Sequence, residues 1–359
     1  MSEVRRDIIT DTWVIVETGR ETVPHNHKRE VARTPACPFC SGNEAMTPNE
    51  ICSIRRDGSW RVRVVPDKDP VLRIEGELAR TGVGIHDMVT GTGANEVVVE
   101  SPEHITNFAA LGEEQISLVL ATWRERLTDL YRDRRFRYVL VFKDHGTLAG
   151  GSTIEHVHSQ VIALPATPRR VKDQLAGARS YFQYKERCIF CDILQDELER
   201  GDRVLLATDR FAVFAPYASR LPFELRVMPR RHCFNYGDTA DDELADLARV
   251  LKRTVAALYR TLSDPPFNLV LHTAPNLLPH GASRRESSLG KSDSAVFSRA
   301  GAASGGAAAG YWETIREDYH WFIEIIPRVK RTDGFEWGSG FFINPTAPER
   351  AVELLKEAL

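Results

Sequence analysis

The sequence predicts an α+β protein made of two tandem halves of related structure, each a mainly antiparallel sheet flanked by helices. Two observations lead to this prediction. One order of strands, helix and histidines occurs twice along the chain, and a Cys-x-x-Cys pair opens each repeat. The halves are expected at residues 1–180 and 181–359.

The repeat has six elements: a Cys-x-x-Cys pair, a strand, a histidine just after it, an amphipathic helix, an apolar strand and a histidine-containing strand. In the first half they lie at Cys37/Cys40, Glu96–Glu100, His104, Glu113–Arg132, Tyr138–Phe142 and Ile154–Leu164. In the second half they lie at Cys188/Cys191, Phe223–Pro229, His232, Asp242–Leu262, Phe267–His272 and Tyr319–Pro327. Six elements in one order indicate an internal duplication.

Three further elements are expected outside the repeat. Strands are predicted at Asp11–Val16 and Trp60–Pro66, and a short helix at Pro348–Leu359. The stretch Ala282–Gly310 is rich in Ser, Gly and Ala and offers little apolar surface to bury. We expect a flexible loop there, with a lid as the alternative.

The composition is that of a soluble globular protein, with 42% hydrophobic and 27% charged residues among 359. A net charge of −3 and a pI near 6.4 give no general basic field for nucleic acid or an anionic membrane. The basic run Arg169–Lys172 is expected to be solvated surface. The N-terminus lacks the apolar run of a signal peptide, and no stretch approaches the roughly 20 apolar residues of a membrane span. A cytoplasmic location is therefore expected.

Four of the six cysteines form the two Cys-x-x-Cys pairs, and histidines follow each pair. Without a secretory signal a disulfide framework is not expected, which leaves zinc sites or a redox dithiol. Thiolate and imidazole ligands in sets of four are typical of structural zinc. We predict two zinc ions per chain, with loss of one metal or iron binding as the alternative. The two ligand sets are Cys37, Cys40, His104 and His156, then Cys188, Cys191, His232 and His320.

The histidine-containing strand of the first half places three polar residues two apart: His156, His158 and Gln160. Alternate residues of a strand share a face, so these three are expected to address one pocket. The alternative is a pair of core histidines. Comparison with the second half separates the roles, because His156 has a counterpart in His320 whereas Phe322 stands where His158 stands. We interpret the shared histidine as a metal ligand and His158 as the residue that does chemistry.

A neutral imidazole is a competent nucleophile towards phosphorus, and the phosphoramidate that forms can be transferred onward. His158 is therefore the predicted nucleophile. Gln160 can donate a hydrogen bond to a phosphoryl oxygen as charge develops there. Just upstream, Gly150, Gly151 and Ser152 are predicted to present N–H groups and a hydroxyl to phosphate, although such a sequence is more often a simple turn.

At these residues the chain resembles the galactose-1-phosphate uridylyltransferase family of the histidine-triad superfamily, close to ADP-glucose phosphorylase-like members. The His156-Val157-His158-Ser159-Gln160 run and both cysteine–histidine sets carry the resemblance. It implies two histidine-triad-like halves, a homodimer and a role in galactose and carbohydrate metabolism. It also implies attack by His158 on the α-phosphorus of a nucleoside diphosphate sugar, with a sugar 1-phosphate as the second substrate and Gln160 holding the nucleotidyl phosphate.

Several positions depart from the family pattern around its nucleotide and phosphate contacts, among them Val157, Asp69 and Asn95. Asp67 and Asp144 stand where the family has asparagine, and of an N-terminal Arg-x-x-Arg-Pro pattern only Arg20 and Pro24 remain. These positions are nevertheless expected to contact the substrate. The metal ligands and the nucleophile match the family, so the departures concern the choice of substrate.

The sequence thus favours a nucleotidyltransferase of the UDP-glucose–hexose-1-phosphate uridylyltransferase type. Reaction would proceed in ping-pong fashion through nucleotidyl-His158. One alternative is a nucleotide-sugar or dinucleotide phosphorylase or hydrolase that uses the same nucleophile. The other is a zinc-stabilised nucleotide-binding protein whose catalysis has lapsed.

Overall fold

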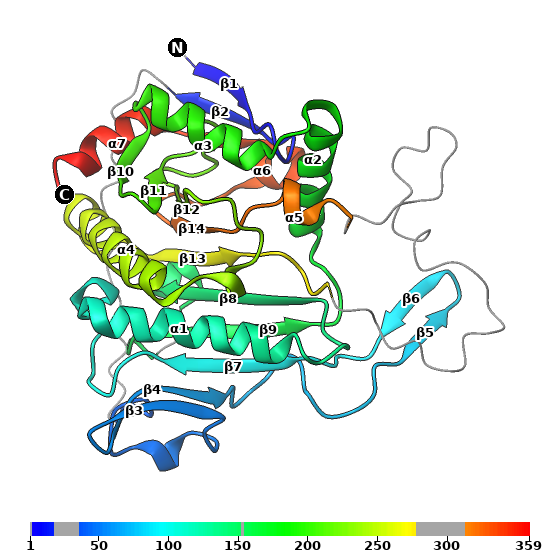
Figure 1. The fold of residues 1–359 in the computed structure, drawn as a ribbon, viewed down its shortest axis with the longest axis vertical. Coiled ribbons are helices and arrows are strands. Elements are labelled where there is room, and N and C mark those ends of the chain that lie inside the picture. The colour runs from blue at the N-terminus through cyan, green and yellow to red at the C-terminus, as the bar shows by residue number, and fades with distance from the viewer. Residues whose placement is uncertain (1, 18–35, 152–153, 278–312) are drawn as a thin grey trace.

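The computed structural model of the protein describes residues 2–17, 36–151, 154–277 and 313–359. Within these ranges the chain builds a ten-stranded antiparallel sheet, in the order β10-β11-β12-β14-β13-β8-β9-β7-β4-β3 (Figure 1). Its strands are β3 (Cys52–Arg56), β4 (Ser59–Pro66), β7 (Ala94–Val99), β8 (Tyr138–His145), β9 (His158–Leu164), β10 (Val204–Ala207), β11 (Phe211–Phe214), β12 (Leu225–Pro229), β13 (Phe267–His272) and β14 (Phe322–Pro327). The predicted α+β class with antiparallel strands flanked by helices is confirmed, but the sheets expected one per half are joined into a single sheet.

The sheet shows the duplication directly. From its centre outward, the strand order β8-β9-β7-β4-β3 on one side corresponds to β13-β14-β12-β11-β10 on the other. The two sets join where β8 pairs with β13, with Lys143 opposite Leu269. The predicted division of the chain at residue 180 falls inside α2 (Arg169–Lys185) and stays a prediction.

One face of the sheet carries the main apolar core. The helices α1 (Glu113–Leu130) and α4 (Asp241–Leu262) lie side by side along this face (Figure 1). Their buried stripes include Trp123 and Leu251, which pack on sheet residues such as Val161. Burial of these apolar faces supplies the main stabilisation of the fold.

The opposite face is covered differently in the two halves. Over the second half, α2 and α3 (Ile189–Arg200) bury a second cluster that contains Phe190, Phe214 and Phe322. Over the first half, the covering is a small cluster around Phe39. Among the described residues, helices cover this face in the second half, and the face next to β9 is only partly covered.

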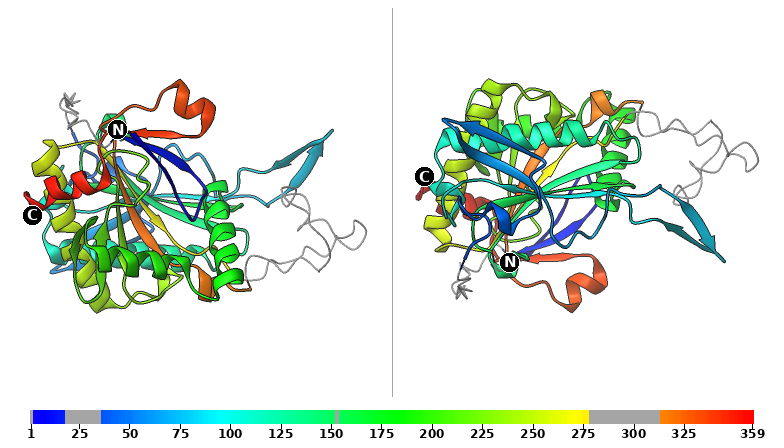
Figure 2. Two further views of the ribbon diagram at one scale, coloured as in Figure 1. Left: turned by 90° about the horizontal axis from the view of Figure 1, so that it is seen from above. Right: turned by 90° about the horizontal axis from the view of Figure 1, so that it is seen from below.

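Smaller elements surround the large sheet. The strands β1 (Ser2–Arg6) and β2 (Trp13–Glu17) form a three-stranded sheet with β15 (Phe342–Asn344). The hairpin of β5 (Arg80–Val83) and β6 (His86–Val89) projects away from the body of the protein (Figure 2). The remaining helices are the short α5 (Ile315–Asp318), α6 (Gly334–Ser339) and α7 (Pro348–Lys356).

Two sequence predictions need correction. The strand expected from Ile154 begins only at His158, because Val157 makes backbone hydrogen bonds to Ile105 and Glu100 rather than to the neighbouring strands. The run Arg169–Lys172, expected to be solvated, starts α2: Arg169 is exposed as expected, whereas Val171 is buried and Arg170 pairs with the buried Glu324. The expected flexible segment Ala282–Gly310 lies outside the described residues. Among the described helices, none is long and apolar enough to cross a membrane.

Candidate active site and metal centres

The first predicted metal set comes together in space. Cys37, Cys40, His104 and His156 place one ligand atom each within 4.8 Å of one another. The His156 Nδ1 lies 3.6 Å from the Cys37 Sγ, and the His104 Nδ1 lies 3.3 Å from the Cys40 Sγ. Sulfur and nitrogen ligands on tetrahedral zinc lie about 3.5 Å apart, given Zn–S near 2.3 Å and Zn–N near 2.0 Å. The four side chains therefore fit a zinc ion.

The donor chemistry agrees with this geometry. His156 is fully buried, and its Nε2 donates a hydrogen bond to the Ser101 carbonyl oxygen at 2.8 Å, which turns the Nδ1 lone pair towards the cysteines. Such an outer partner commonly fixes the tautomer of a metal-binding histidine. Burial and the neighbouring Cys37 raise the pKa of Cys40 to about 11, so the thiolate needs a cation beside it.

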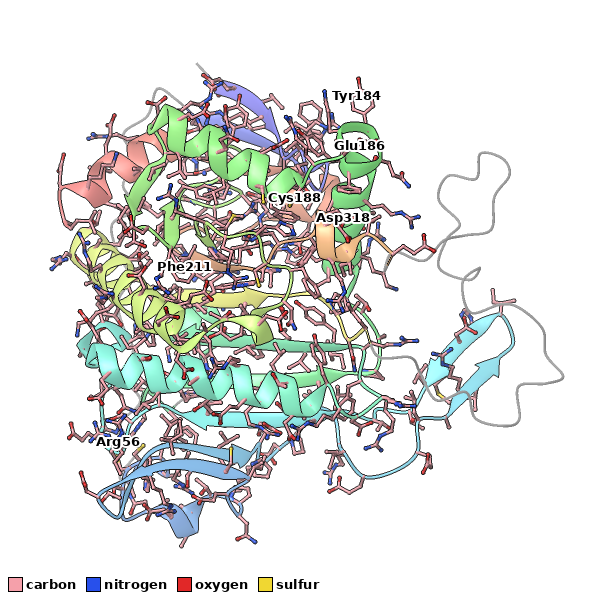
Figure 3. The ribbon with its side chains drawn as sticks, in the orientation of Figure 1. Arg56, Tyr184, Glu186, Cys188, Phe211 and Asp318 are labelled. Carbon is pink, nitrogen blue, oxygen red and sulfur yellow. The ribbon has the colours of Figure 1, made fainter. Side chains whose placement is uncertain are left out.

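The second set is assembled with three of its four predicted members. Cys188, Cys191 and His232 have ligand atoms within 4.8 Å of one another, with 3.2 Å between the Cys191 Sγ and the His232 Nδ1. Cys188 caps the start of α3 and lies next to Asp318, whose carbonyl oxygen accepts a hydrogen bond from its thiol (Figure 3). These three residues fit a metal ion.

His320 lies beside this group without joining it. Its ring centroid is 5.5 Å from that of His232, but its Nδ1 faces the Trp321 carbonyl oxygen at 2.9 Å and its Nε2 faces that of Arg231 at 3.1 Å. Burial lowers the pKa of His320 to about 4, so the ring is neutral and has a single N–H to donate. One of the two ring nitrogens therefore carries no proton and cannot donate to the carbonyl oxygen that it faces. The role of His320 as fourth ligand stays a prediction.

His158 opens β9 and is oriented by its own backbone. Its Nδ1 donates to the His156 carbonyl oxygen at 2.7 Å, which leaves the Nε2 as the nitrogen with a lone pair. The ring packs edge-on against Phe39, with 5.3 Å between centroids. Burial, with a smaller contribution from the charge of Lys143, lowers the pKa of His158 to about 4. The side chain is thus a neutral imidazole with an oriented nucleophilic nitrogen.

The other side of β9 locks this orientation. Ser159 points into the core, where its Oγ accepts a hydrogen bond of 2.7 Å from the indole Nε1 of Trp123 on α1. Because alternate strand residues point to opposite faces, His158 and Gln160 are left half-buried on the other face. Gln160 lies between Val97 of β7 and Phe142 of β8. The two predicted catalytic side chains therefore share one face, whereas His156 precedes the strand and turns to the cysteines.

A buried ion pair lies behind His158 and holds its backbone. The Lys143 Nζ donates to the Glu100 Oε2 and to the His158 carbonyl oxygen, both at 2.7 Å. Lys143 is 3% exposed and Glu100 is fully buried. Sequence analysis missed both residues, although a lysine directly after the apolar run Tyr138–Phe142 was the available signal. We assign Lys143 a positioning role for the backbone of His158.

This assignment predicts that kcat and the free energy of unfolding respond differently to substitutions at Lys143 and Glu100. The variant Lys143→Met leaves Glu100 buried without its partner and is expected to lose about 3–5 kcal/mol of unfolding free energy. The double variant Lys143→Met/Glu100→Gln should recover most of this loss, as followed by urea unfolding. Its kcat is nevertheless expected to stay about tenfold or more below wild type at a similar KM, because the backbone of His158 is no longer held. Recovery of kcat together with stability would leave Lys143 a purely structural residue.

The predicted glycine-rich loop adopts a closed turn. Gly146 and Gly150 have positive φ values of 78° and 86°, and a Cβ at Gly151 would lie only 2.8 Å from the Gly146 carbonyl oxygen. The N–H groups of Gly150 and Gly151 donate to the carbonyl oxygens of Thr147 and Gly146. In this conformation they are engaged within the loop, so phosphate binding by these groups stays a prediction. Ser152 lies outside the described residues.

The other predicted substrate contacts lie at the margins of the site. Asp144 follows Phe142 on the same face of β8, and its Oδ1 accepts a hydrogen bond of 2.6 Å from the Asn268 Nδ2. Burial raises the pKa of Asp144. Asp67 lies just beyond β4, where its Oδ2 accepts a hydrogen bond of 3.4 Å from the Asn95 Nδ2. Arg20 lies outside the described residues, and the contacts of all three with substrate stay predictions.

Fold and site together define a class: an α+β protein with an oriented, neutral histidine beside a cysteine–histidine group that fits a metal ion. Residues 73–168 match the N-terminal domain of galactose-1-phosphate uridyl transferase, and residues 174–283 match its C-terminal domain. The chain belongs to the galactose-1-phosphate uridyl transferase family.

Individual relatives cover nearly the whole chain. It is 28% identical to the ADP-glucose phosphorylase of Arabidopsis thaliana, over 99% of this chain and 92% of the relative. It is 25% identical to the galactose-1-phosphate uridylyltransferase of Thermotoga maritima, over 99% and 98%. The crystal structure of an ADP-glucose phosphorylase from Arabidopsis thaliana with bound ADP-glucose superposes with a TM-score of 0.78 at 26% identity, covering 100% of this chain and 99% of that one. A uridylyltransferase structure gives 0.71 at 25% identity, over 100% and 98%.

Proposed function

We propose that the protein moves a nucleotidyl group from a nucleoside diphosphate sugar to a second phosphate compound through a covalent nucleotidyl-His158 intermediate. The observation that carries this proposal is the hydrogen bond from the His158 Nδ1 to the His156 carbonyl oxygen. It directs the Nε2 lone pair outward on the face that also bears Gln160. Histidine nucleophiles of this kind split one difficult transfer into two easier ones.

In the first step the His158 Nε2 attacks the α-phosphorus, and the bond from that phosphorus to the bridging oxygen breaks. The leaving sugar 1-phosphate keeps the electron pair. The positive charge that develops on the imidazole is stabilised by the His156 carbonyl oxygen, which accepts from the Nδ1–H. In the second step an oxygen of the acceptor phosphate attacks the same phosphorus and releases His158 unchanged.

The remaining residues of the site position the reactants. Gln160 can donate its amide N–H to a phosphoryl oxygen, where charge builds in the transition state. A metal ion held by Cys37, Cys40, His104 and His156 would constrain the chain immediately before the nucleophile. We assign it, and a metal ion at Cys188, Cys191 and His232, a structural role.

We propose a sugar 1-phosphate as the acceptor, so that the reaction is of the hexose-1-phosphate uridylyltransferase type. Matches to both domains of galactose-1-phosphate uridyl transferase support this acceptor. The second candidate is a phosphorylase, in which inorganic phosphate collects the nucleotide. The likeness to ADP-glucose phosphorylase over 99% of the chain supports that candidate. By analogy with the family we also propose that the protein is a homodimer.

The acceptor can be read from the products of a single experiment. UDP-glucose or ADP-glucose labelled at the α-phosphorus is expected to leave label on the protein, which is then separated from free nucleotide. Addition of galactose 1-phosphate should release the label as a new nucleoside diphosphate sugar. Release by inorganic phosphate as nucleoside diphosphate would favour the phosphorylase, and release by water as nucleoside monophosphate the hydrolase. A folded, zinc-loaded protein that takes no label from either donor would contradict covalent transfer.

A further inference from the structure

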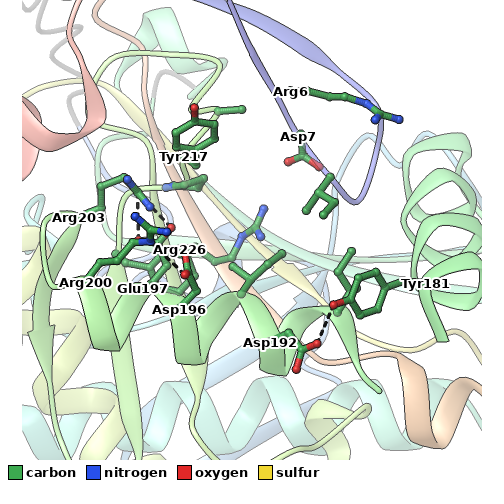
Figure 4. Close-up of a pocket in the computed structure, with 16 residues that line it drawn as sticks. Arg6, Asp7, Tyr181, Asp192, Asp196, Glu197, Arg200, Arg203, Tyr217 and Arg226 are labelled. Carbon is green, nitrogen blue, oxygen red and sulfur yellow. Dashed lines mark hydrogen bonds and ion pairs between the residues drawn. The ribbon is translucent and has the colours of Figure 1, made fainter. Parts of the chain in front are cut away.

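The second half contains a cavity that the proposed transfer does not use. It lies between α3, the end of β11 and the segment that follows β1, and its volume is about 560 Å³ (Figure 4). Cavities of this size are typical of small-molecule sites. Its apolar wall includes Ile8, Ile193 and Phe214, and the aromatic rings of Tyr181 and Tyr217 line it as well.

Strand register shows what this cavity corresponds to in the first half. Arg226 of β12 lies opposite Glu324 of β14, as Val97 of β7 lies opposite Gln160 of β9. Phe214 lies opposite Arg226, as Val65 lies opposite Val97. The cavity therefore covers the counterpart of the sheet face beside His158.

In this counterpart Phe322 stands at the position that His158 has in the first half. The ring of Phe322 lies under the guanidinium of Arg226, 4.5 Å from ring centroid to Cζ. A ligand bound here would meet an arginine on the sheet face where the first half has Val97. The cavity is suited to binding without turnover.

Arg226 is buried, with 7% of its surface exposed, and it lines the cavity. Its Nε is buried without a hydrogen-bond partner, and no hydrogen bond or ion pair joins the Arg226 side chain to any described residue. Figure 4 shows its guanidinium pointing into the open space between α3 and Asp7. Burial of a charged group without a partner costs several kcal/mol.

Neighbouring carboxylates are already engaged by other groups. Glu324 binds Arg170 at 2.6 Å and Arg220 at 3.1 Å, and Arg220 also binds Glu224 at 2.9 Å. Both buried carboxylates are therefore paired by arginines other than Arg226. The acidic residues that line the cavity also have partners: Asp192 pairs with Tyr181 and Arg187, Asp196 with Arg200, Glu197 with Arg203, and Asp7 with the N–H groups of Ile9 and Thr10.

We propose that this cavity is a non-catalytic binding site for a small phosphate-bearing molecule whose oxyanion is held by Arg226. A guanidinium presents two parallel N–H donors that match a phosphate group, and the apolar and aromatic wall accommodates the body of the ligand. The proposal is independent of transfer at His158.

Equilibrium dialysis with three labelled probes, inorganic phosphate, glucose 1-phosphate and ADP, tests the site in the full-length, zinc-loaded protein. For at least one probe, the wild type is expected to bind about one equivalent per chain more than the Arg226→Met variant binds. Arg226→Lys keeps the positive charge but loses the two parallel N–H donors of the guanidinium, and should bind that probe about tenfold more weakly than wild type. Arg200→Met is the matched control, since Arg200 lines the same cavity but is 60% exposed and paired with Asp196. The control is expected to bind as the wild type does, and transfer activity should be the same in all four proteins.

Thermal unfolding supplies the second measurement. In phosphate-free buffer Arg226→Met is expected to melt no lower than wild type, because an apolar side chain replaces an unpaired buried charge. Saturating probe should raise the melting temperature of the wild type more than that of the variant. Equal binding of all three probes by wild type and Arg226→Met overturns the site. An Arg226→Met protein that melts lower and responds to every probe as wild type does makes Arg226 a packing residue over Phe322.

Discussion

Replacement of His158 by asparagine is expected to lower nucleotidyl transfer by about 10⁴-fold or more, because no nucleophile is left to form the covalent intermediate. Asparagine is a conservative choice for this position. Its Nδ2 can donate to the His156 carbonyl oxygen as the imidazole Nδ1 does, at 2.7 Å in the wild type. The side chain offers no lone pair where the Nε2 stood, so the change removes chemistry and preserves the local fold.

Two measurements check this expectation. Covalent label from an α-labelled nucleoside diphosphate sugar should be absent from His158→Asn, and zinc content and urea unfolding should match the wild type. His86→Ala is the matched control, since His86 is exposed on the β5–β6 hairpin. It should keep full labelling and full activity. Label retained by His158→Asn would move the nucleophile to another residue.

The order of the helices and strands, and the residues that form the core, could be predicted from the local sequence pattern. The helix predicted at Glu113–Arg132 is α1 at Glu113–Leu130, and the one at Asp242–Leu262 is α4 at Asp241–Leu262. Periodic apolar residues specify both where a helix forms and which face it buries. The first cysteine–histidine set and three of the four members of the second were predictable for a related reason, because a duplicated chain brings equivalent positions to equivalent places.

What local pattern did not predict depends on contacts between distant segments. Arg170, expected to be solvated, forms an ion pair with Glu324, which is 1% exposed and 154 residues away. Lys143 reaches Glu100 and the backbone of His158 only after β8 has paired with β9. The start of β9 was predicted four residues too early. Val157 forms backbone hydrogen bonds with Ile105 and Glu100, and the pattern of side chains does not indicate such bonds.

Loss of either metal group is expected to destabilise the protein strongly, but loss of the first alone should also remove activity. In the first group Cys40 is tied to His104 and His156, and His156 precedes the nucleophile by two residues. The peptide carbonyl of His156 also accepts the hydrogen bond that orients His158. Release of the metal ion would therefore loosen the segment that holds the nucleophile.

The second group has no such connection. Cys191 joins the start of α3 to His232, which follows β12 in the other half of the sheet. A metal ion there closes a loop of the second half, where Phe322 takes the place of the nucleophile. Its loss should cost folding free energy and leave the chemistry at His158 largely intact in the molecules that remain folded.

The paired variants Cys40→Ser and Cys191→Ser separate these roles. Each is expected to lower zinc content by about one ion per chain and the free energy of unfolding by about 4 kcal/mol or more. At a temperature where both stay folded, covalent labelling per folded molecule should fall about tenfold or more in Cys40→Ser and less than about twofold in Cys191→Ser. Cys52→Ser is the control, because Cys52 belongs to neither metal group among the described residues. Full zinc content in either metal-site variant would remove that cysteine from the ligand set, and equal loss of labelling in both would show that the second group also supports His158.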